Sequence, residues 1–290
     1  MNKHISGAVL ITLSMVIFSW IGPFVRTIQL PPLMIIFYSS MITSLLLMGF
    51  FVRMRWLGRV VPKEHIGWLV ASAVLVLGNV FCYFRAYELT TLANTVLTHY
   101  TAPIFAALCA PLLLNEKIER VTVAALFISM TGLLLIAANG LSFSSADFAG
   151  IMYGTASGLF YGLAIVVTKK VVEKFHIAVI LFWQCVITVL VVAPFVPFID
   201  HNITFNTLLL LILYALTASL LGVLLYMKGL RYVEAQHAGV LAYAEPLLVV
   251  MIGMVLYDEM LMMSSAVGGL LIVFSGCLIL RAEAGREPLL

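Results

Sequence analysis

A carboxylate and a proline stand side by side within one long apolar segment of the sequence. Glu245 precedes Pro246, and mainly apolar residues flank the pair on both sides. A carboxylate in apolar surroundings is costly unless it faces a cavity, pairs with a cation or is protonated. The pattern therefore predicts that Glu245 binds a cationic group or exchanges a proton. The structural alternative is a protonated Glu245 that forms a hydrogen bond to a neighbouring helix.

Two prolines interrupt apolar segments at related places. Pro103 follows Tyr100 by three residues, and Pro246 follows Tyr243 by three residues. A proline inside a helix removes a backbone hydrogen bond and frees a carbonyl oxygen, and at membrane depth such carbonyls are tolerated where they are buried or line a cavity. Both prolines are predicted hinges. Both tyrosines, which lie on roughly the same helical face as the prolines, are predicted to contact a bound molecule.

Other polar and aromatic residues within the apolar segments are candidates for the lining of a binding site. Aromatic faces suit ring-bearing or cationic ligands, although Tyr and Trp also populate membrane interfaces. These candidates are Tyr83, Tyr226, Asn79, His99, Trp20, Tyr161, Trp183 and Gln184. Arg85 and Glu88 are one helical turn apart and form a candidate gate, with a local ion pair as the alternative.

The composition excludes a soluble protein. Of the 290 residues, 63% are hydrophobic and 10% are charged, whereas soluble domains carry about 25% charged residues, so the excess apolar surface must face lipid. The net charge is +3 and the basic residues form no continuous stripe, so no nucleic-acid partner is predicted. The four cysteines lie in apolar segments without metal-ligand spacing, and neither a metal site nor a cofactor is predicted.

Ten segments are long and apolar enough to cross a bilayer, which takes about 20 residues for a helix. The connections between them are too short for a soluble domain. The predicted spans cover residues 5–25, 31–52, 66–87, 93–114, 121–139, 148–168, 177–198, 207–227, 236–257 and 264–281. The sequence thus predicts an all-α polytopic membrane protein.

The basic residues also predict an orientation. If the N-terminus is placed in the cytoplasm, 14 of the 16 Lys and Arg residues fall on the cytoplasmic side, and Arg26 and Arg85 fall outside. Cytoplasmic loops of membrane proteins are enriched in Lys and Arg. Both termini are therefore predicted to be cytoplasmic, in the inner membrane of a bacterium.

The two halves of the sequence align when one is shifted by 143 positions. The shift pairs Tyr83 with Tyr226, Tyr100 with Tyr243, Pro103 with Pro246 and Glu116 with Glu259. Residues 1–142 and 143–290 are therefore predicted to be two repeats of five spans each, and an odd number of spans makes the second repeat inverted. Inverted repeats are common in secondary transporters, because two such halves can exchange roles between inward-open and outward-open states.

Two related runs of the sequence are Tyr100-Thr-Ala-Pro103 … Leu-Leu-Asn-Glu116 and Tyr243-Ala-Glu-Pro246 … Leu-Tyr-Asp-Glu259. In these runs the chain resembles the drug/metabolite transporter superfamily, specifically its ten-helix EamA-type members. The resemblance covers nearly the whole chain. It implies a central cavity between the repeats, with spans five and ten on the outside. The family often has an Arg in the second span, where this chain has Ser39-Ser40, so an anion-binding role of that helix is not carried over.

Together these features predict a secondary transporter and not an enzyme. We expect it to export amino acids or related amines by alternating access, as a monomer or homodimer in the lipid bilayer, with protons as a candidate coupling ion. The alternatives are uptake or exchange of another metabolite, such as a nucleotide-derived or quaternary-amine compound, and, more distantly, an intramembrane enzyme. The sequence contains no Walker-type glycine loop, HExxH or GxSxG motif, which argues against an ATP-driven pump and against the common hydrolases.

Overall fold

The computed structural model describes residues 3–60, 64–142, 144–257 and 262–286. In these residues the chain forms helices joined by short connections and contains no strand. Ten helical stretches are long and apolar enough to cross a membrane, and we number them spans 1 to 10. They are Lys3–Ile28, Pro32–Arg53, Ile66–Leu89, Leu92–Leu114, Arg120–Ala137, Ser145–Val172, Ile177–Phe198, Phe205–Leu230, Ala235–Leu256 and Met263–Ala284. The prediction of ten spans is confirmed.

Several spans consist of more than one helix. Span 1 consists of α1 (Lys3–Phe18) and α2 (Ile21–Ile28), and span 2 is α3 (Pro32–Arg53), which α4 (Leu57–Val60) follows. Span 3 is α5 (Ile66–Leu89), and span 4 consists of α6 (Leu92–His99) and α7 (Ala102–Leu114). Span 5 is α8 (Arg120–Ala137), which the 3-10 turn η1 (Ala138–Gly140) follows. Span 6 consists of η2 (Ser145–Asp147) and α9 (Phe148–Val172), and span 7 consists of α10 (Ile177–Val192) and η3 (Ala193–Phe198). Span 8 consists of α11 (Phe205–Tyr214), the π-helix η4 (Ala215–Gly222) and α12 (Val223–Leu230). Span 9 consists of α13 (Ala235–Ala242) and α14 (Ala244–Tyr257), and span 10 is α15 (Met263–Ala284).

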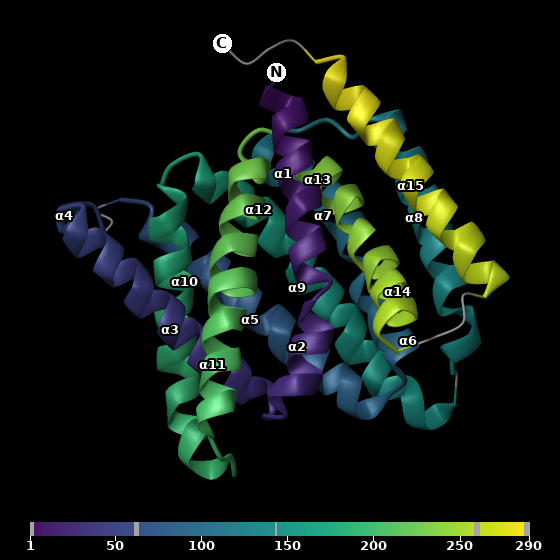
Figure 1. Cartoon of the computed structure of the whole chain (residues 1–290). Coiled ribbons are helices and arrows are strands. Elements are labelled where there is room, and N and C mark those ends of the chain that lie inside the picture. The colour runs from purple at the N-terminus through teal and green to yellow at the C-terminus, as the bar shows by residue number, and fades with distance from the viewer. Residues whose placement is uncertain (1–2, 61–63, 143, 258–261, 287–290) are drawn as a thin grey trace.

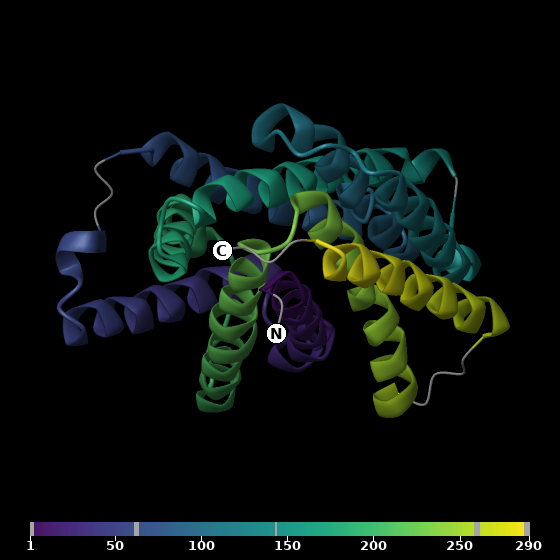
Figure 2. The same ribbon diagram turned by 90° about the horizontal axis from the view of Figure 1, so that it is seen from above.

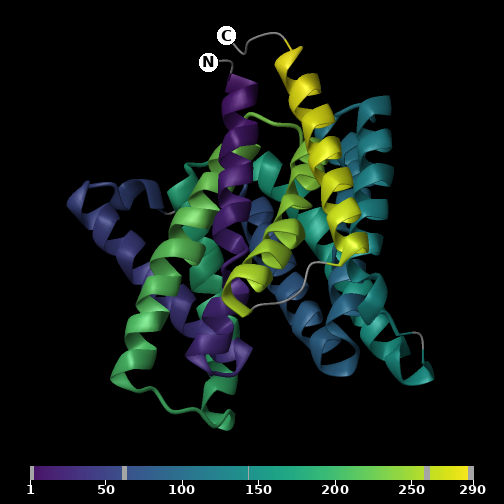
Figure 3. The same cartoon turned by 45° about the vertical axis from the view of Figure 1, so that its right-hand side comes forward.

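The first and last helices meet at one end of the molecule. α1 begins and α15 ends at the top of Figure 1, and we call this the terminal end and the opposite one the distal end. Figure 2 looks onto the terminal end and shows α3 and α15 at opposite edges. α8 and α15 lie side by side (Figures 1 and 3), so spans 5 and 10 form a pair at one edge of the molecule, as the resemblance implies.

Small residues bring several helices into backbone contact. A Cβ atom added to Gly132 of α8 would lie 2.6 Å from the Gly268 carbonyl oxygen of α15, and one added to Gly162 of α9 would lie 2.6 Å from the Ala102 carbonyl oxygen of α7. In both pairs a larger residue would push the helices apart. Span 6, with a glycine at every fourth position from 150 to 162, thus packs against span 4 inside the molecule.

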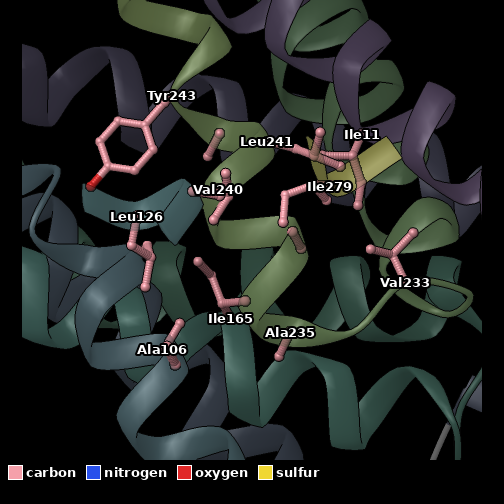
Figure 4. Close-up of a cluster of buried hydrophobic side chains, with 14 of the residues drawn as sticks. Ile11, Ala106, Leu126, Ile165, Val233, Ala235, Val240, Leu241, Tyr243 and Ile279 are labelled. Carbon is pink, nitrogen blue, oxygen red and sulfur yellow. The ribbon is translucent and has the colours of Figure 1, made fainter. Parts of the chain in front are cut away.

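A buried apolar cluster joins the two halves of the chain (Figure 4). Ile11 and Leu126 contribute to it from the first half, and Ile165, Leu241 and Ile279 contribute from the second half. Because these side chains come from spans 1, 5, 6, 9 and 10, the halves are packed into one body rather than linked as separate domains.

Spans 4 and 9 are broken where the sequence places Tyr-x-x-Pro. α6 ends at His99 and α7 begins at Ala102, while α13 ends at Ala242 and α14 begins at Ala244. Pro103 lies in the first turn of α7, a position that proline tolerates because the N–H it lacks has no helical partner there. At each break the C-terminal end of one half-helix and the N-terminal end of the next therefore lie inside the span rather than at its ends.

Candidate functional site: a central cavity between the repeats

A cavity of about 280 Å³ lies among spans 1, 2, 3, 6, 7 and 8. Aliphatic, aromatic and uncharged polar side chains line it, and none of the described lining residues is Lys, Arg, His, Asp or Glu. The polar ones include Ser39 and Ser40 of span 2, Asn79 of span 3, and Gln184 and Thr188 of span 7. The cavity lining can therefore supply hydrogen bonds to a polar ligand but no full charge of either sign.

Three tyrosines line the same cavity. Tyr161 comes from α9, Tyr214 from the end of α11, and Tyr226 from α12. The hydroxyls of Tyr161 and Tyr226 lie near each other, yet the buried Tyr226 hydroxyl makes no well-formed hydrogen bond with the described residues. A buried hydroxyl without a partner is costly, so this group is available to a ligand.

His99 connects three spans beside the cavity. Its ring stacks on that of Tyr161 at a centroid distance of 5.1 Å and meets the ring of Tyr83 edge-on at 4.8 Å. Its Nδ1 lies 2.8 Å from the Ser157 hydroxyl, which donates to the Asn79 side-chain oxygen at 2.8 Å. Because the serine proton is directed to Asn79, this network assigns an Nδ1–H donor to His99. His99 thus positions Asn79, Tyr83 and Tyr161.

Glu245 lies in the first turn of α14, directly after the break in span 9. Its carboxylate interacts electrostatically with Tyr83, Tyr100, Tyr161 and Tyr214, which belong to spans 3, 4, 6 and 8. The Tyr100 hydroxyl is within hydrogen-bonding reach of it.

No Lys or Arg among the described residues forms an ion pair with Glu245. The side chain is partly exposed. The N-terminus of a helix favours a negative charge, so the start of α14 is a suitable place to hold a carboxylate inside the membrane. The arrangement is a single carboxylate surrounded by tyrosines, without a cationic partner from the described part of the protein.

Tyr100 and Tyr243 lie at the two helix breaks and contact each other. Their ring centroids are 5.9 Å apart, and Tyr243 is fully buried. The Tyr243 hydroxyl donates to the Tyr100 carbonyl oxygen at 2.8 Å. The structure therefore places Tyr243 against Tyr100 of the other repeat, and Tyr243 is not among the residues that line the cavity.

The remaining predicted site residues lie apart from the cavity lining. The Trp183 indole N–H donates to the Val60 carbonyl oxygen at 2.7 Å, and Trp20 is 43% exposed at the break between α1 and α2. Arg85 and Glu88 form an exposed local ion pair at 2.5 Å, which is the geometry of the alternative given for them above. Tyr214, in contrast, was missed by sequence reasoning, since it has no tyrosine counterpart in the first repeat.

Polar contacts at the terminal end join the two repeats and also join spans 6 and 8 within the second repeat. Both Glu116 carboxylate oxygens accept from the Ala235 N–H, at 3.1 and 3.0 Å, where span 9 begins. Burial raises the pKa of Glu116, and the bond from Ala235 opposes this. The ammonium of Lys169 donates to the carbonyl oxygens of Leu230 and Val233, at 2.8 Å each, where span 8 ends. Glu259, the repeat partner of Glu116, lies outside the described residues.

Comparison with known proteins agrees with this architecture. The sequence profile of the EamA-like transporter family matches the chain twice, over residues 5–138 and 148–281. An uncharacterized transporter of Archaeoglobus fulgidus is 27% identical over 273 residues, which cover 94% of this chain and 95% of that protein. The pseudopaline exporter CntI of Pseudomonas aeruginosa is 27% identical over 191 residues, which cover 65% of this chain and 66% of that protein.

A solved crystal structure superposes with a TM-score of 0.83 at 18% sequence identity, over 94% of this chain and 97% of that chain. At this identity the superposition concerns the fold alone. The family profile, in contrast, matches almost the whole chain as two halves of five spans. The protein is therefore a multi-pass membrane protein with a small-molecule substrate, and it belongs to the EamA-like transporter family.

Proposed function

We propose that this transporter exports small amine-bearing metabolites, namely amino acids or related amines, by alternating access. The observation that carries the proposal is Glu245, a carboxylate without a cationic partner among the described residues, surrounded by tyrosines from four spans. An ammonium group would gain a charge-assisted hydrogen bond from the carboxylate and attraction from the aromatic faces.

The lining of the cavity argues against a phosphorylated substrate. Phosphate groups are bound by Arg and Lys side chains, and the described lining residues include neither. Ligand pockets for drug-sized molecules occupy about 300–1,000 Å³, so a cavity of about 280 Å³ suits a smaller metabolite. These points favour an amine over a nucleotide-derived compound, whereas a quaternary amine would suit the same tyrosines and remains the alternative substrate.

Two observations support export as the direction of transport. The distribution of Lys and Arg supports cytoplasmic termini in a bacterial inner membrane, so the terminal end, where the repeats are joined by Glu116 and Ala235, would face the cytoplasm. A relative named as an exporter shares 27% of its aligned residues with this chain. We also propose residues 1–142 and 143–290 as the two units that exchange roles during the cycle.

Counterflow in proteoliposomes tests the proposal. Purified protein is reconstituted in vesicles loaded with an unlabelled amino acid or amine, and uptake of the same labelled compound is followed, with phosphorylated metabolites as the comparison set. A carrier should accumulate label transiently, whereas a channel or an enzyme should not. Exchange of phosphorylated metabolites without any exchange of amines would contradict the proposed substrate class.

A further inference from the structure

A buried acid lies between two histidines at the terminal end. Glu283, near the end of α15, is fully buried. One of its carboxylate oxygens lies 2.5 Å from Nδ1 of His237, and the other lies 3.1 Å from Nδ1 of His4. His237 is 0% exposed and His4 is 8% exposed. Nδ1 of His237 is placed to donate to Glu283, whereas the contact from His4 has ion-pair distance without well-formed hydrogen-bond geometry.

This cluster connects four spans from both repeats. His237 of span 9 also lies 3.1 Å from the Thr122 hydroxyl and 3.6 Å from the Glu119 carboxylate, at the start of span 5. Arg286 binds Glu119 at 2.5 Å and also binds Glu234. Glu119, Glu234 and His237 offer donor atoms within 4.8 Å of one another, but the Arg286 guanidinium already joins the two carboxylates. We therefore consider protons, not a metal ion, as the exchangeable cation.

The charges around the histidines do not balance when the imidazoles are neutral. The carboxylates are Glu116, Glu119, Glu173, Glu234 and Glu283, and the cations that interact with them are Lys169 and Arg286. Five carboxylates against two cations leave an excess of negative charge. Protonation of both His4 and His237 would reduce this excess, and it would add a second N–H donor to each ring.

The distal end holds a matching cluster without imidazoles. The shift of 143 residues maps His4 onto Asp147 and His237 onto Asn94. Asp147 accepts from the hydroxyls of Thr90 at 2.7 Å and Ser142 at 2.6 Å, and the Asn94 amide donates to the same two residues. An amide and hydroxyls thus suffice to join these spans at one end. Histidines at the other end differ from these groups in that an imidazole can bind a proton and become a cation.

We propose that His4, His237 and Glu283 form a proton-binding site that controls the closure of the terminal end. Protons taken up from the aqueous phase at this end reduce the excess negative charge and keep spans 1, 5, 9 and 10 together. When the imidazoles lose their protons, the excess negative charge favours separation of these spans. The proposed site binds protons and requires no substrate. Its test is therefore independent of the proposed substrate class.

The test measures a distance across the terminal end by pulsed electron paramagnetic resonance. Spin labels are attached to Ile118→Cys and Lys228→Cys, two exposed positions in different repeats, in protein whose native cysteines at positions 82, 109, 185 and 277 are replaced by Ala. Samples in lipid nanodiscs are frozen at about pH 5.5 and about pH 8.5, on either side of the usual imidazole range. No substrate is added.

The short, closed distance should dominate at the lower pH and lose population at the higher pH. Linkage sets the limit at about tenfold per pH unit for each proton released on opening. His4→Gln should weaken this response and the double variant with His237→Gln should abolish it. His201→Gln removes a distal-end histidine bonded to Tyr38 and should respond like the unchanged protein. Identical distances at both pH values in the unchanged protein, or a full response in the double variant, would overturn the proposal.

Discussion

The Tyr243 hydroxyl donates a hydrogen bond to the main-chain carbonyl of Tyr100 at 2.8 Å, and the two tyrosines occupy the same position in the two repeats. The carbonyl that accepts this bond is one of those left without a helical partner by the break in span 4. The Tyr100 hydroxyl instead lies within hydrogen-bonding reach of Glu245. Two positions that the repeat makes equivalent therefore have different partners in this conformation.

Tyr243→Phe should destabilise the protein by about 1–3 kcal/mol, because it leaves a buried carbonyl oxygen unsatisfied. Tyr87→Phe, at a tyrosine that is 55% exposed, should change the stability by less than about 0.5 kcal/mol. Thermal unfolding in the same detergent measures both. Equal melting temperatures for the two variants would show that the bond between the helix breaks contributes nothing.

Glycine substitutions test the contact between spans 4 and 6. A Cβ atom at Gly158 would lie 2.7 Å from the Thr98 carbonyl oxygen, whereas one at Gly276 would have no atom within 4 Å. Gly158→Ala should therefore cost about 1–3 kcal/mol of stability through overpacking. Gly276→Ala should be neutral or stabilise by up to about 1 kcal/mol, because alanine favours the helix. A stable Gly158→Ala protein with unchanged transport would show that spans 4 and 6 can separate at no cost.

The positions of the spans and of the breaks in spans 4 and 9 could be predicted, because they depend on apolar length and on proline chemistry, whereas the break in span 1 was not predicted. The direction of individual side chains could not. Trp183 and Gln184 are adjacent, and neighbours in a helix point about 100° apart, so Gln184 faces the cavity while Trp183 bonds to Val60. Tyr214 immediately precedes the π-helix of span 8, where the helical register shifts. No pattern of spacing in the sequence marks such a shift.

Tyr226→Phe separates ligand binding from stability. The Tyr226 hydroxyl is buried without a well-formed hydrogen bond to the described residues, so its removal should leave the melting temperature unchanged or slightly higher. If a substrate binds this hydroxyl, the variant should lose about 1 kcal/mol of binding free energy, or roughly fivefold in affinity. Tyr153→Phe, which lies outside the cavity lining, is the control in binding titrations. Unchanged affinity would reduce Tyr226 to a packing residue.

Topology determines which side of the membrane the terminal end faces. Reporter fusions after Glu119 and Lys170 should report the cytoplasm, and fusions after Ser144 and His201 should report the outside, as the distribution of Lys and Arg predicts. All four positions lie between or at the ends of spans, so a reporter should follow the native insertion. The opposite pattern would place the terminal end outside and would contradict the proposed orientation.

The last prediction separates two roles of Glu245. Glu245→Gln keeps the shape and hydrogen-bonding capacity of the side chain but can neither titrate nor carry a charge. If the carboxylate recognises a substrate ammonium, the variant should lose about 1.5–3 kcal/mol of binding free energy, which is roughly ten- to hundredfold in affinity.

If Glu245 carries a coupling proton instead, the variant should still bind and exchange substrate but should fail to concentrate it in response to a pH gradient. Counterflow and gradient-driven accumulation in the same proteoliposomes distinguish these outcomes. Glu88→Gln is the matched control, because it removes an exposed carboxylate that pairs with Arg85 on the same helix. Normal affinity together with normal accumulation in the Glu245 variant would assign the carboxylate to structure, through its interaction with Tyr100 at the broken helix.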